Sequence, residues 1–327
     1  MKNIKFYIGP MSKNIVDSII EFCNINDYRI GLIASRRQID YNSGYVNGWN
    51  TKSFSDYVKT KTENVLVCRD HGGIGQGDYY DNGTLSFYND SKRYNLIHID
   101  PWKVHKKYED GLRETIDNII FINSLNDKCL FEVGTEESIR RFETNEFEKF
   151  LYDLKNGLGV IFDKIVYGVI QSGTGLLGTE NIGKFNNDRC KDMSKICKKY
   201  GIQSKEHNGD YLTNEEIRLR FNLGLDAINI APEFGVFETK IILESLNNEQ
   251  IDNLYNLCYD SKKWVKWFSD DFIPEENKKL LIETCGHYLF NDENFKKIKY
   301  SIPNIDNKIK KLLLEKLKIM KEINEDR

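Results

Sequence analysis

NVLVCRD (64–70) and YNLIHID (94–100) are short runs of apolar and β-branched residues, and each run ends in an aspartate. Runs of this length and composition are typical of strands that are buried in a parallel sheet. Six further runs complete the pattern: NIKFYIG (3–9), RIGLIAS (29–35), CLFEVGT (129–135), KIVYGVIQ (164–171), IQSKEHN (202–208) and DAINIAP (226–232). Eight strands within about 240 residues predict an α/β fold, a closed (β/α)8 TIM barrel, and disfavour an open doubly wound sheet.

Segments with apolar residues at helical spacing separate these runs, as successive βαβ units require. The segments are SKNIVDSIIEFCN (12–24), TKSFSDYVKT (51–60), DGLRETIDNIIFINSLN (110–126), TNEFEKFLYDLKN (144–156), NDRCKDMSKICKKY (187–200) and TNEEIRLRFNLG (213–224). Thr213, followed by Glu216 three residues later, has the pattern of a capping box. The third βα unit has the weakest pattern. No helical period follows its strand directly, and the glycine-rich segment GGIGQGDYYDNG (72–83) there predicts a lid or an irregular connection. No strand–helix turn carries G-x-G-x-x-G, which disfavours a Rossmann fold.

Residues 249–327 have few strand signals, and their apolar residues recur at helical spacing. The final segment, IDNKIKKLLLEKLKIMKEINEDR (305–327), is strongly amphipathic. We therefore predict a barrel domain over residues 1–248 and a helical C-terminal extension over 249–327, packed on the barrel or on a partner subunit. Acidic residues among the lysines of the final segment argue against a membrane-surface helix.

Charges of both signs interleave along the chain, which has 47 basic residues, 50 acidic residues and a formal net charge of −3. Nucleic acid is therefore not an expected partner. The apolar stretches are strand-sized and the N-terminal MKNIKFYIGPM lacks the features of a signal peptide, so we expect a cytoplasmic protein that does not enter a membrane. Seven cysteines without a C-x-x-C pair indicate reduced thiols in the core.

Three of the five histidines, His71, His98 and His207, fall at or near predicted strand ends. In a TIM barrel these ends meet at the C-terminal mouth, where active sites lie. The acidic residues at the same mouth are Asp70, Asp100, Glu132, Glu136, Glu206 and Asp210. A divalent cation would explain both groups, because buried charges are costly unless they are paired or bound to metal. Such an ion polarises a carbonyl and stabilises an enediolate, and Asp70, beside His71, is best placed to move the proton.

Two strand ends that carry glycine are candidates for holding a phosphate. QSGTGLLG (171–178) can expose backbone N–H groups around Gly173 and Gly175, although a short glycine loop is more often a turn. NIAPEFG (229–235) leads into a helix N-terminus, which is the usual phosphate position in these barrels.

Arg36 and Arg37 directly follow the second predicted strand. Their planar guanidinium groups suit a second phosphate or a carboxylate, so Arg36 is a candidate substrate ligand. A surface ion pair is the alternative role for these arginines.

The residues quoted so far resemble a known family. Over most of its length the chain is similar to the GatZ/KbaZ family, the non-catalytic subunits of class II tagatose-bisphosphate aldolases. The similar segments are ASRRQIDYNSGYVNGWNTKSFSDYV (34–58), LVCRDHGG (66–73) for the family's G-D-H, LIHID (96–100) for its I-H-L-D, EVGTE (132–136) for its I-G-T-E, SKEHNGDYLT (204–213) and INIAPEFGVFET (228–239). The resemblance implies that Gln38 and Asp210 bind substrate.

The chain resembles the catalytic class II fructose- and tagatose-bisphosphate aldolases more distantly. Their D-H motif, which supplies a catalytic aspartate and a zinc-ligating histidine, corresponds to Asp70 and His71. Their later histidine motif corresponds to His207, and the segment that follows it places Asn229 near the substrate phosphate.

One position departs from those aldolases. Thr174 stands where their strand-six histidine would be, so the resemblance supplies only two of three imidazole ligands. His98 from the fourth strand, or Glu136 beyond the fifth, is predicted to complete the set, and Glu136 is also a candidate catalytic carboxylate.

The residues and the resemblance together predict a class II aldolase-like enzyme. It would cleave or condense a phosphorylated sugar by metal-dependent carbonyl chemistry through an enediolate. Zinc is the expected ion, with manganese or cobalt as alternatives. Three other functions stay open, a metal-dependent sugar-phosphate epimerase, a non-catalytic aldolase subunit and a plain sugar-phosphate binding protein. The expected protein partner is a second copy of the chain or a second aldolase barrel.

Overall fold

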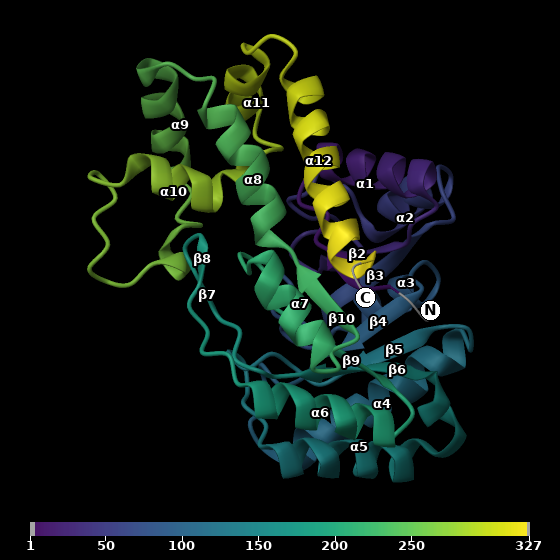
Figure 1. Cartoon of the computed structure of the whole chain (residues 1–327). Coiled ribbons are helices and arrows are strands. Elements are labelled where there is room, and N and C mark those ends of the chain that lie inside the picture. The colour runs from purple at the N-terminus through teal and green to yellow at the C-terminus, as the bar shows by residue number, and fades with distance from the viewer. Residues whose placement is uncertain (1–3, 326–327) are drawn as a thin grey trace.

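Eight parallel strands close into a barrel, as the sequence predicts (Figure 1). The structure is a computed structural model and describes residues 4–325. The barrel strands are β1 (Phe6–Ile8), β2 (Ile30–Ser35), β3 (Val65–Gly72), β4 (Leu96–Ile99), β5 (Leu130–Val133), β6 (Ile165–Ile170), β9 (Gln203–Glu206) and β10 (Ala227–Ile230). Each of the eight predicted runs forms one of these strands. β1 pairs with both β2 and β10, which closes the sheet.

Alternate residues of each strand point into the barrel, where they form layers. A small apolar cluster fills the lower interior: Ile4, Tyr7, Ile33, Cys68, Leu96, Tyr167 and Ala227. Two residues further along three of these strands, the interior becomes polar, with Asp70 above Cys68, His98 above Leu96 and Asn229 above Ala227. The change from apolar to polar therefore occurs at the C-terminal ends of the strands.

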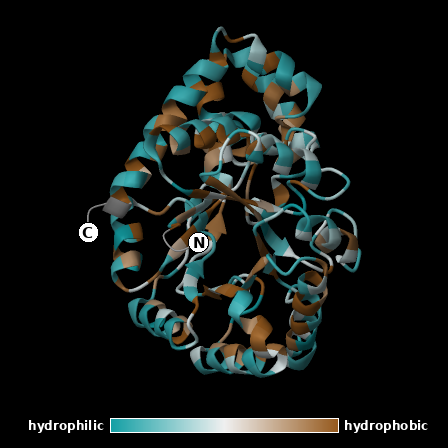
Figure 2. Cartoon of the chain, turned by 90° about the vertical axis from the view of Figure 1, so that its right-hand side faces the viewer, coloured by the Kyte–Doolittle hydropathy of each residue, from teal (hydrophilic) through white to brown (hydrophobic). Residues whose placement is uncertain are grey.

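Helices surround the barrel and bury their apolar faces against its outer side. They are α1 (Lys13–Asn26), α2 (Thr51–Lys59), α3 (Thr84–Ser91), α4 (Tyr108–Leu125), α5 (Thr144–Leu158), the 3-10 helix η1 (Gly159–Lys164), α6 (Asn187–Lys199), α7 (Asn214–Asn222) and α8 (Pro232–Leu243). The capping box at Thr213 and Glu216 is present at the start of α7. Figure 2 shows the strands at the centre largely hydrophobic and the outward helix faces hydrophilic.

The predicted glycine loop after β6 contains a short hairpin, β7 (Leu176–Leu177) and β8 (Glu180–Asn181). The hairpin contacts the C-terminal extension, because the Gly178 N–H donates to the carbonyl of Trp267 at 2.8 Å. Two-residue strands are too short to show a hydrophobic period, so no sequence pattern predicts this hairpin.

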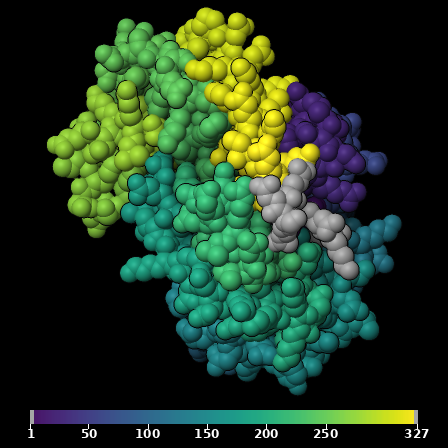
Figure 3. Space-filling view, in the orientation of Figure 1, coloured from purple at the N-terminus to yellow at the C-terminus, as the bar shows by residue number. Residues whose placement is uncertain are grey.

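The C-terminal extension is helical, as predicted. It consists of α9 (Asn248–Asp260), η2 (Val265–Trp267), α10 (Lys278–Cys285), η3 (Gly286–Leu289), α11 (Glu293–Tyr300) and α12 (Ile305–Glu325). α12 packs along α1 and α8 and returns the chain to the barrel (Figures 1 and 3). Its buried Ile309, Leu313 and Leu317 belong to the same hydrophobic cluster as the barrel helices.

Two expectations from composition concern the cysteines and membrane-spanning helices. All seven cysteines are buried free thiols, as predicted for core residues. Among the described residues, no helix combines the length and apolar character needed to span a bilayer.

Candidate metal centre

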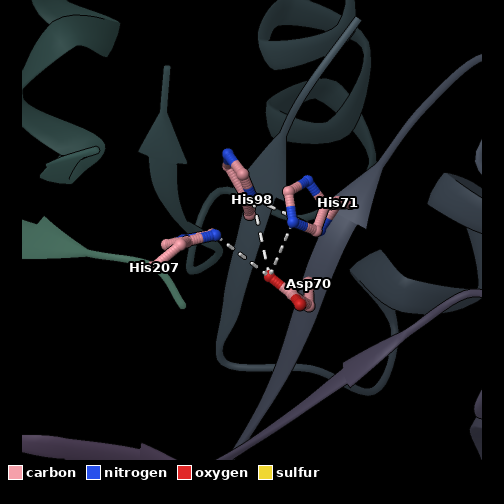
Figure 4. Close-up of side chains that lie close together, drawn as sticks. All are labelled: Asp70, His71, His98 and His207. Carbon is pink, nitrogen blue, oxygen red and sulfur yellow. Dashed lines mark hydrogen bonds and ion pairs between the residues drawn. The ribbon is translucent and has the colours of Figure 1, made fainter. Parts of the chain in front are cut away.

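Three imidazoles and one carboxylate converge at the C-terminal mouth of the barrel (Figure 4). Asp70 and His71 come from β3, His98 from β4, and His207 directly follows β9. Each offers one ligand atom, and these four atoms lie within 4.8 Å of one another. Asp70 Oδ1 is 3.8 Å from His71 Nε2, 3.8 Å from His98 Nδ1 and 3.7 Å from His207 Nδ1. The structure thus brings together the three predicted histidine ligands and the predicted catalytic aspartate.

An irregularity at the end of β3 allows two consecutive residues to face the same point. Neighbouring strand residues normally point to opposite sides of a sheet. Here the β3–β4 register shifts between Arg69 and Gly72, and His71 has a φ of 42°, in the left-handed region. His71 therefore joins Asp70 at the mouth and does not point outward.

Two of the imidazoles are held by buried carboxylates. His71 Nδ1 lies 2.6 Å from Asp100 Oδ2, and His207 Nε2 lies 2.7 Å from Glu132 Oε1. Because a carboxylate accepts the hydrogen bond, each ring carries a proton on the nitrogen that faces the carboxylate, which is Nδ1 in His71 and Nε2 in His207. The other ring nitrogens, His71 Nε2 and His207 Nδ1, face the mouth and are the atoms that would bind a metal ion. Carboxylate–histidine pairs of this kind orient metal ligands in many proteins.

His98 is oriented by backbone groups. Its Nε2 donates to the carbonyl of Gly134 at 3.1 Å, so its Nδ1 carries the lone pair. That lone pair accepts the His71 backbone N–H at 3.2 Å, and a bound ion would compete with this N–H for it. His98 is therefore the weakest of the three candidate ligands.

The charges around the mouth fit a divalent cation. Asp70 Oδ1 is buried and, within the described residues, has no hydrogen-bond partner. Four carboxylates lie around the mouth, those of Asp70, Asp100, Glu132 and Glu136, and Lys205 pairs with Glu132. A concentration of negative charge in a buried site requires compensation, and three imidazoles with one carboxylate are a donor set that Zn²⁺, Mn²⁺ and Co²⁺ accept.

The titration behaviour of the cluster follows from these charges. Burial alone would raise the pKa of Asp70, but the three imidazoles hold it well below its usual range. Burial would lower the pKa of His71, yet the carboxylates of Asp70, Asp100 and Glu136 raise it to about 10. For His207 burial dominates and lowers the pKa. His71 thus binds a proton tightly, and a metal ion would have to displace it.

Lys205 lies beneath the cluster and was not identified from the sequence. It is fully buried, its Nζ is 2.6 Å from Glu132 Oε2, and it lies over the ring of Tyr7 at 3.6 Å. Burial would raise the pKa of Glu132, but Lys205 and His207 lower it to about 2. Strand alternation was the missed signal, since Lys205 lies two residues before the inward-facing His207.

Glu136 faces the pocket that opens above the cluster. The pocket has a volume of about 430 Å³ and is lined by Ser35, Arg37, His71, Gln76, Lys103, Lys106, Glu136, Ser138, Ile139 and Lys266. Asn208 Nδ2 and Ser138 Oγ each donate to the Glu136 carboxylate at 2.6 Å. Glu136 Oε2 lies 3.8 Å from His71 Nε2, so this carboxylate is both next to the cluster and next to the space for a substrate.

Arg36 forms ion pairs within the protein, which is the second of the two roles that the sequence left open, although it is buried and not at the surface. Its guanidinium is buried and bonds to Asp40, to the Gly73 carbonyl and, through two nitrogens, to Asp81. These internal partners use the guanidinium N–H groups, so Arg36 is not available to a substrate phosphate. Its neighbour Arg37 lines the pocket instead.

Asp210 caps the helix N-terminus at which a phosphate was expected. Asp210 Oδ1 accepts the N–H groups of Ala231 and Glu233 at 2.8 Å each, at the start of α8. Burial and the nearby Glu233 carboxylate raise the pKa of Asp210 to about 8. The Asp210 carboxyl group therefore occupies the N-terminus of α8 where a phosphate was expected, and its own contact with substrate stays a prediction.

The glycine loop after β6 is also committed to packing. Gly173 has a φ of 100°, and a Cβ on it would lie 2.0 Å from the Lys184 carbonyl oxygen. The Gly175 N–H donates to Asn181 Oδ1 at 3.2 Å. Thr174, which replaces the aldolase histidine, donates to the His207 carbonyl at 2.9 Å. Within the described chain, this loop supports the hairpin and offers little to a phosphate.

Asn229 and Gln38 remain candidates for substrate contacts. Asn229 is buried in the polar layer of the barrel, and among the described residues neither its Oδ1 nor its Nδ2 has a hydrogen-bond partner. Gln38 Oε1 accepts the Ser35 N–H at 2.8 Å, and the side chain lines a second, smaller cavity of about 150 Å³ with Tyr45 and His287. Amide groups of this kind suit the hydroxyl groups of a sugar.

Comparison with known proteins shows which solved structures share this fold. No family model and no curated protein matches the sequence. A solved structure from Sinorhizobium meliloti 1021, described as a probable tagatose 6 phosphate kinase, matches with a TM-score of 0.71 and 13% identity, over 95% of this chain and 86% of that one. The YdjI aldolase of Escherichia coli K12 matches with a TM-score of 0.57 and 12% identity, over 97% and 90%. The fructuronate-tagaturonate epimerase UxaE of Cohnella laeviribosi matches with a TM-score of 0.66 and 10% identity, over 97% and 81%.

These matches span nearly the whole chain, including its C-terminal extension. At such low identity the likeness is one of fold. The chain therefore adopts the (β/α)8 barrel fold that it shares with an aldolase, an epimerase and a probable sugar-phosphate kinase, as the resemblance noted in the sequence implied.

Proposed function

We propose that this protein is a metal-dependent enzyme of the class II aldolase type that cleaves or condenses a phosphorylated sugar. The observation that carries the proposal is the arrangement of His71, His98 and His207, each of which turns one ring nitrogen toward Asp70 Oδ1, a buried oxygen without a hydrogen-bond partner among the described residues. Zinc is the favoured ion, with manganese or cobalt as alternatives. A divalent ion held there supplies Lewis-acid polarisation of a substrate carbonyl and stabilises enediolate charge.

Residues of the protein would bind the ion, transfer the proton and bind the substrate. Asp70 Oδ1 faces the same point as the three imidazole nitrogens, which favours a ligand role over the proton transfer expected from the sequence. Glu136 lines the substrate pocket and is held by Asn208 and Ser138, so its carboxylate is the better placed to move a proton on the substrate. Asn229 is placed to bind a substrate hydroxyl group.

Epimerisation is the second candidate reaction. It is favoured by the fact that two carboxylates, Asp70 and Glu136, both lie 3.8 Å from His71 Nε2. In this reaction Asp70 would have the proton-transfer role expected from the sequence, and the two carboxylates would remove a proton and return it without cleavage of a carbon–carbon bond. The epimerase among the structural neighbours acts, by its name, on fructuronate and tagaturonate.

Several expectations from the sequence stay proposals. These are the domain boundary at residues 248/249, the cytoplasmic location and the protein partner, either a second copy of the chain or a second aldolase barrel. A non-catalytic subunit would use the same barrel without turnover.

The test combines metal analysis with activity. We expect about one zinc, manganese or cobalt ion per chain in protein purified without chelator, and loss of that ion in His71→Ala and His207→Ala. His105→Ala, which changes a histidine outside the cluster, is the matched control and should keep the ion. The metal-loaded protein is then screened with ketose phosphates for aldehyde release and for stereochemical inversion.

Each result has a defined meaning. Aldehyde release supports the aldolase, and inversion without release supports the epimerase. Metal binding without either reaction, in a protein that co-purifies with a second barrel, supports the non-catalytic subunit. Absence of metal even after reconstitution would contradict the proposal.

A further inference from the structure

Four cations line the pocket above the metal centre, and apart from Lys106, which lies three residues after Lys103, they come from distant parts of the chain. Arg37 follows β2, Lys103 follows β4, and Lys266 lies in η2 of the C-terminal extension. All three line the same pocket as His71 and Glu136. Arg37 and Lys266 also line the smaller cavity with Gln38, so they stand between the two spaces.

Two of these cations, Lys103 and Lys266, have no close ion-pair partner among the described residues, although the Glu136 carboxylate lines the same pocket. In the part of the chain that the structure describes, no carboxylate oxygen lies within 4.0 Å of Lys103 Nζ or Lys266 Nζ. Arg37 has one carboxylate neighbour, with its Nε 4.0 Å from Asp78 Oδ1. Lys103 donates to the Gly75 carbonyl at 3.0 Å, and Lys266 lies over the ring of Trp267 at 4.7 Å.

The charges of Arg37, Lys103 and Lys266 also repel one another. Burial and the charge of Arg37 lower the pKa of Lys266 to about 8, although the charge of Glu136 acts in the opposite direction. Burial, with the charges of Arg37 and Lys266, lowers the pKa of Lys103 as well, although the charge of Asp100 raises it. Like charges that are held together without a partner favour the binding of an anion, which would relieve their repulsion.

The other anion positions expected in this barrel are filled by the protein itself. Asp210 occupies the N-terminus of α8, and Arg36 is bound to Asp40 and Asp81. We propose that Arg37, Lys103 and Lys266 form the anion site of this protein, which binds the phosphate or carboxylate group of the substrate while the reacting carbon lies toward His71 and Glu136. The inference rests on the proposed function for the identity of that substrate.

The C-terminal extension is part of this site. Lys266 reaches the mouth because η2 is fixed to the β7–β8 hairpin, through the hydrogen bond from Gly178 to Trp267. In Figure 3 the extension lies directly against that hairpin. The extension therefore supplies substrate recognition in addition to packing.

The full-length protein is titrated with D-fructose 6-phosphate, D-fructuronate or uncharged D-fructose. Binding is measured by tryptophan fluorescence, because Trp267 lies beside Lys266. We expect both charged sugars to bind at least about tenfold more tightly than D-fructose. Arg37→Gln, Lys103→Met and Lys266→Met should each weaken binding of the charged sugars about tenfold and leave D-fructose unaffected. Lys195→Met, which removes an exposed lysine on α6, is the charge-matched control.

The comparison between the two charged sugars identifies the source of the anion, a phosphate or a carboxylate, and either result supports the site. Equal binding of charged and uncharged sugar would overturn the proposal, as would a Lys266→Met protein that behaves like Lys195→Met. Asp210→Asn should leave anion binding unchanged, and a gain of affinity there would move the site to α8. Metal content measured on the same samples separates the two proposals. Anion binding without metal would contradict only the proposed metal-dependent function. Metal binding without anion binding would contradict only the proposed anion site.

Discussion

His71 has a strained backbone conformation, with a φ of 42°. A non-glycine residue with positive φ costs on the order of 1–3 kcal/mol, and such residues persist where the surroundings fix them. The hydrogen bond to Asp100 and the ladder of β3 with β4 provide that constraint. The strained turn is what brings two consecutive side chains to one point, and so it belongs to the function of the site.

The raised pKa of His71 predicts that metal binding depends on pH. Without metal, His71 keeps the proton on Nε2 below a pH of about 10, and each ion that binds must displace it. The metal affinity should therefore rise about tenfold per pH unit between pH 6 and 8. Calorimetric titration with zinc in buffers of different ionisation enthalpy measures both the affinity and the released proton. An affinity that does not change across this range would contradict the assignment of His71.

Asp70 and Glu136 should differ when each loses its charge. Asp70→Asn removes a ligand, so we expect its metal content to fall. Glu136→Gln keeps the ligand set and removes the proton carrier, so metal should stay while kcat falls about 10²- to 10⁴-fold. Elemental analysis beside steady-state kinetics on the identified substrate distinguishes the two. Loss of metal in Glu136→Gln with full occupancy in Asp70→Asn would reverse the roles.

The sequence pattern located the candidate site well but not the residues that support it. Strand ends meet at one mouth, so His71, His98 and His207 could be placed together from the sequence alone. Arg36 and Arg37 could not be told apart, because their roles depend on whether Asp81 in a distant loop reaches the guanidinium. Lys266 could not be predicted as a site residue, because the rule that active-site residues lie at the ends of barrel strands does not cover the C-terminal extension.

At the scale of elements, α8 shows how a shared fold changes its ligand positions. Its N-terminus has N–H groups of the kind that hold phosphate in many barrels, and Asp210 satisfies two of them. The element was predicted correctly, while its ligand was not. The acceptor comes from the loop between β9 and α7, and its approach depends on a turn that the sequence pattern does not reveal.

Replacing Asp210 tests this capping role. Asp210→Ala leaves two N–H groups at the start of α8 without their acceptor, so we expect the free energy of unfolding to fall by about 1–2 kcal/mol. The matched control is Asp188→Ala, which removes an exposed acidic residue from the first turn of α6 and should cost less than about 0.5 kcal/mol. Urea denaturation measures both. Equal stability of the two variants would contradict the cap.

The strands were easier to predict than their connections. Most buried parallel strands leave a continuous apolar run, and each of the eight predicted runs forms a strand. The third unit shows the limit, because the glycine-rich loop 72–83 is followed by the eight-residue helix α3, which the pattern did not reveal. A short helix with few apolar positions has too little period to be recognised.

For the whole molecule, the main question is whether barrel and extension behave as one unit. Helix α12 buries Leu313 and Leu317 in the hydrophobic cluster of the barrel helices, and Asn14 of α1 donates to Asp306 at 2.8 Å. The contacts between the two parts are therefore both apolar and polar. The boundary at 248/249 therefore divides the chain in sequence, while in the structure the two parts pack against each other.

We expect barrel and extension to unfold together. Fluorescence reports tryptophans of both parts, Trp49 and Trp102 in the barrel and Trp264 and Trp267 in the extension, and its urea transition should coincide with that of far-UV circular dichroism. Leu313→Ala, within α12, should lower the stability of the whole chain by about 2–5 kcal/mol. The exposed Ile319→Ala is the control for the same helix. Two separate transitions would show that the extension folds on its own.

The proposed function depends on one divalent ion that binds among three imidazoles and Asp70. Anomalous diffraction at the zinc absorption edge, from crystals of the full-length protein soaked in zinc, locates such an ion without reference to activity. We expect a single strong peak among His71 Nε2, His98 Nδ1, His207 Nδ1 and Asp70 Oδ1. A peak elsewhere, or none at that position with zinc in excess, would contradict the metal centre.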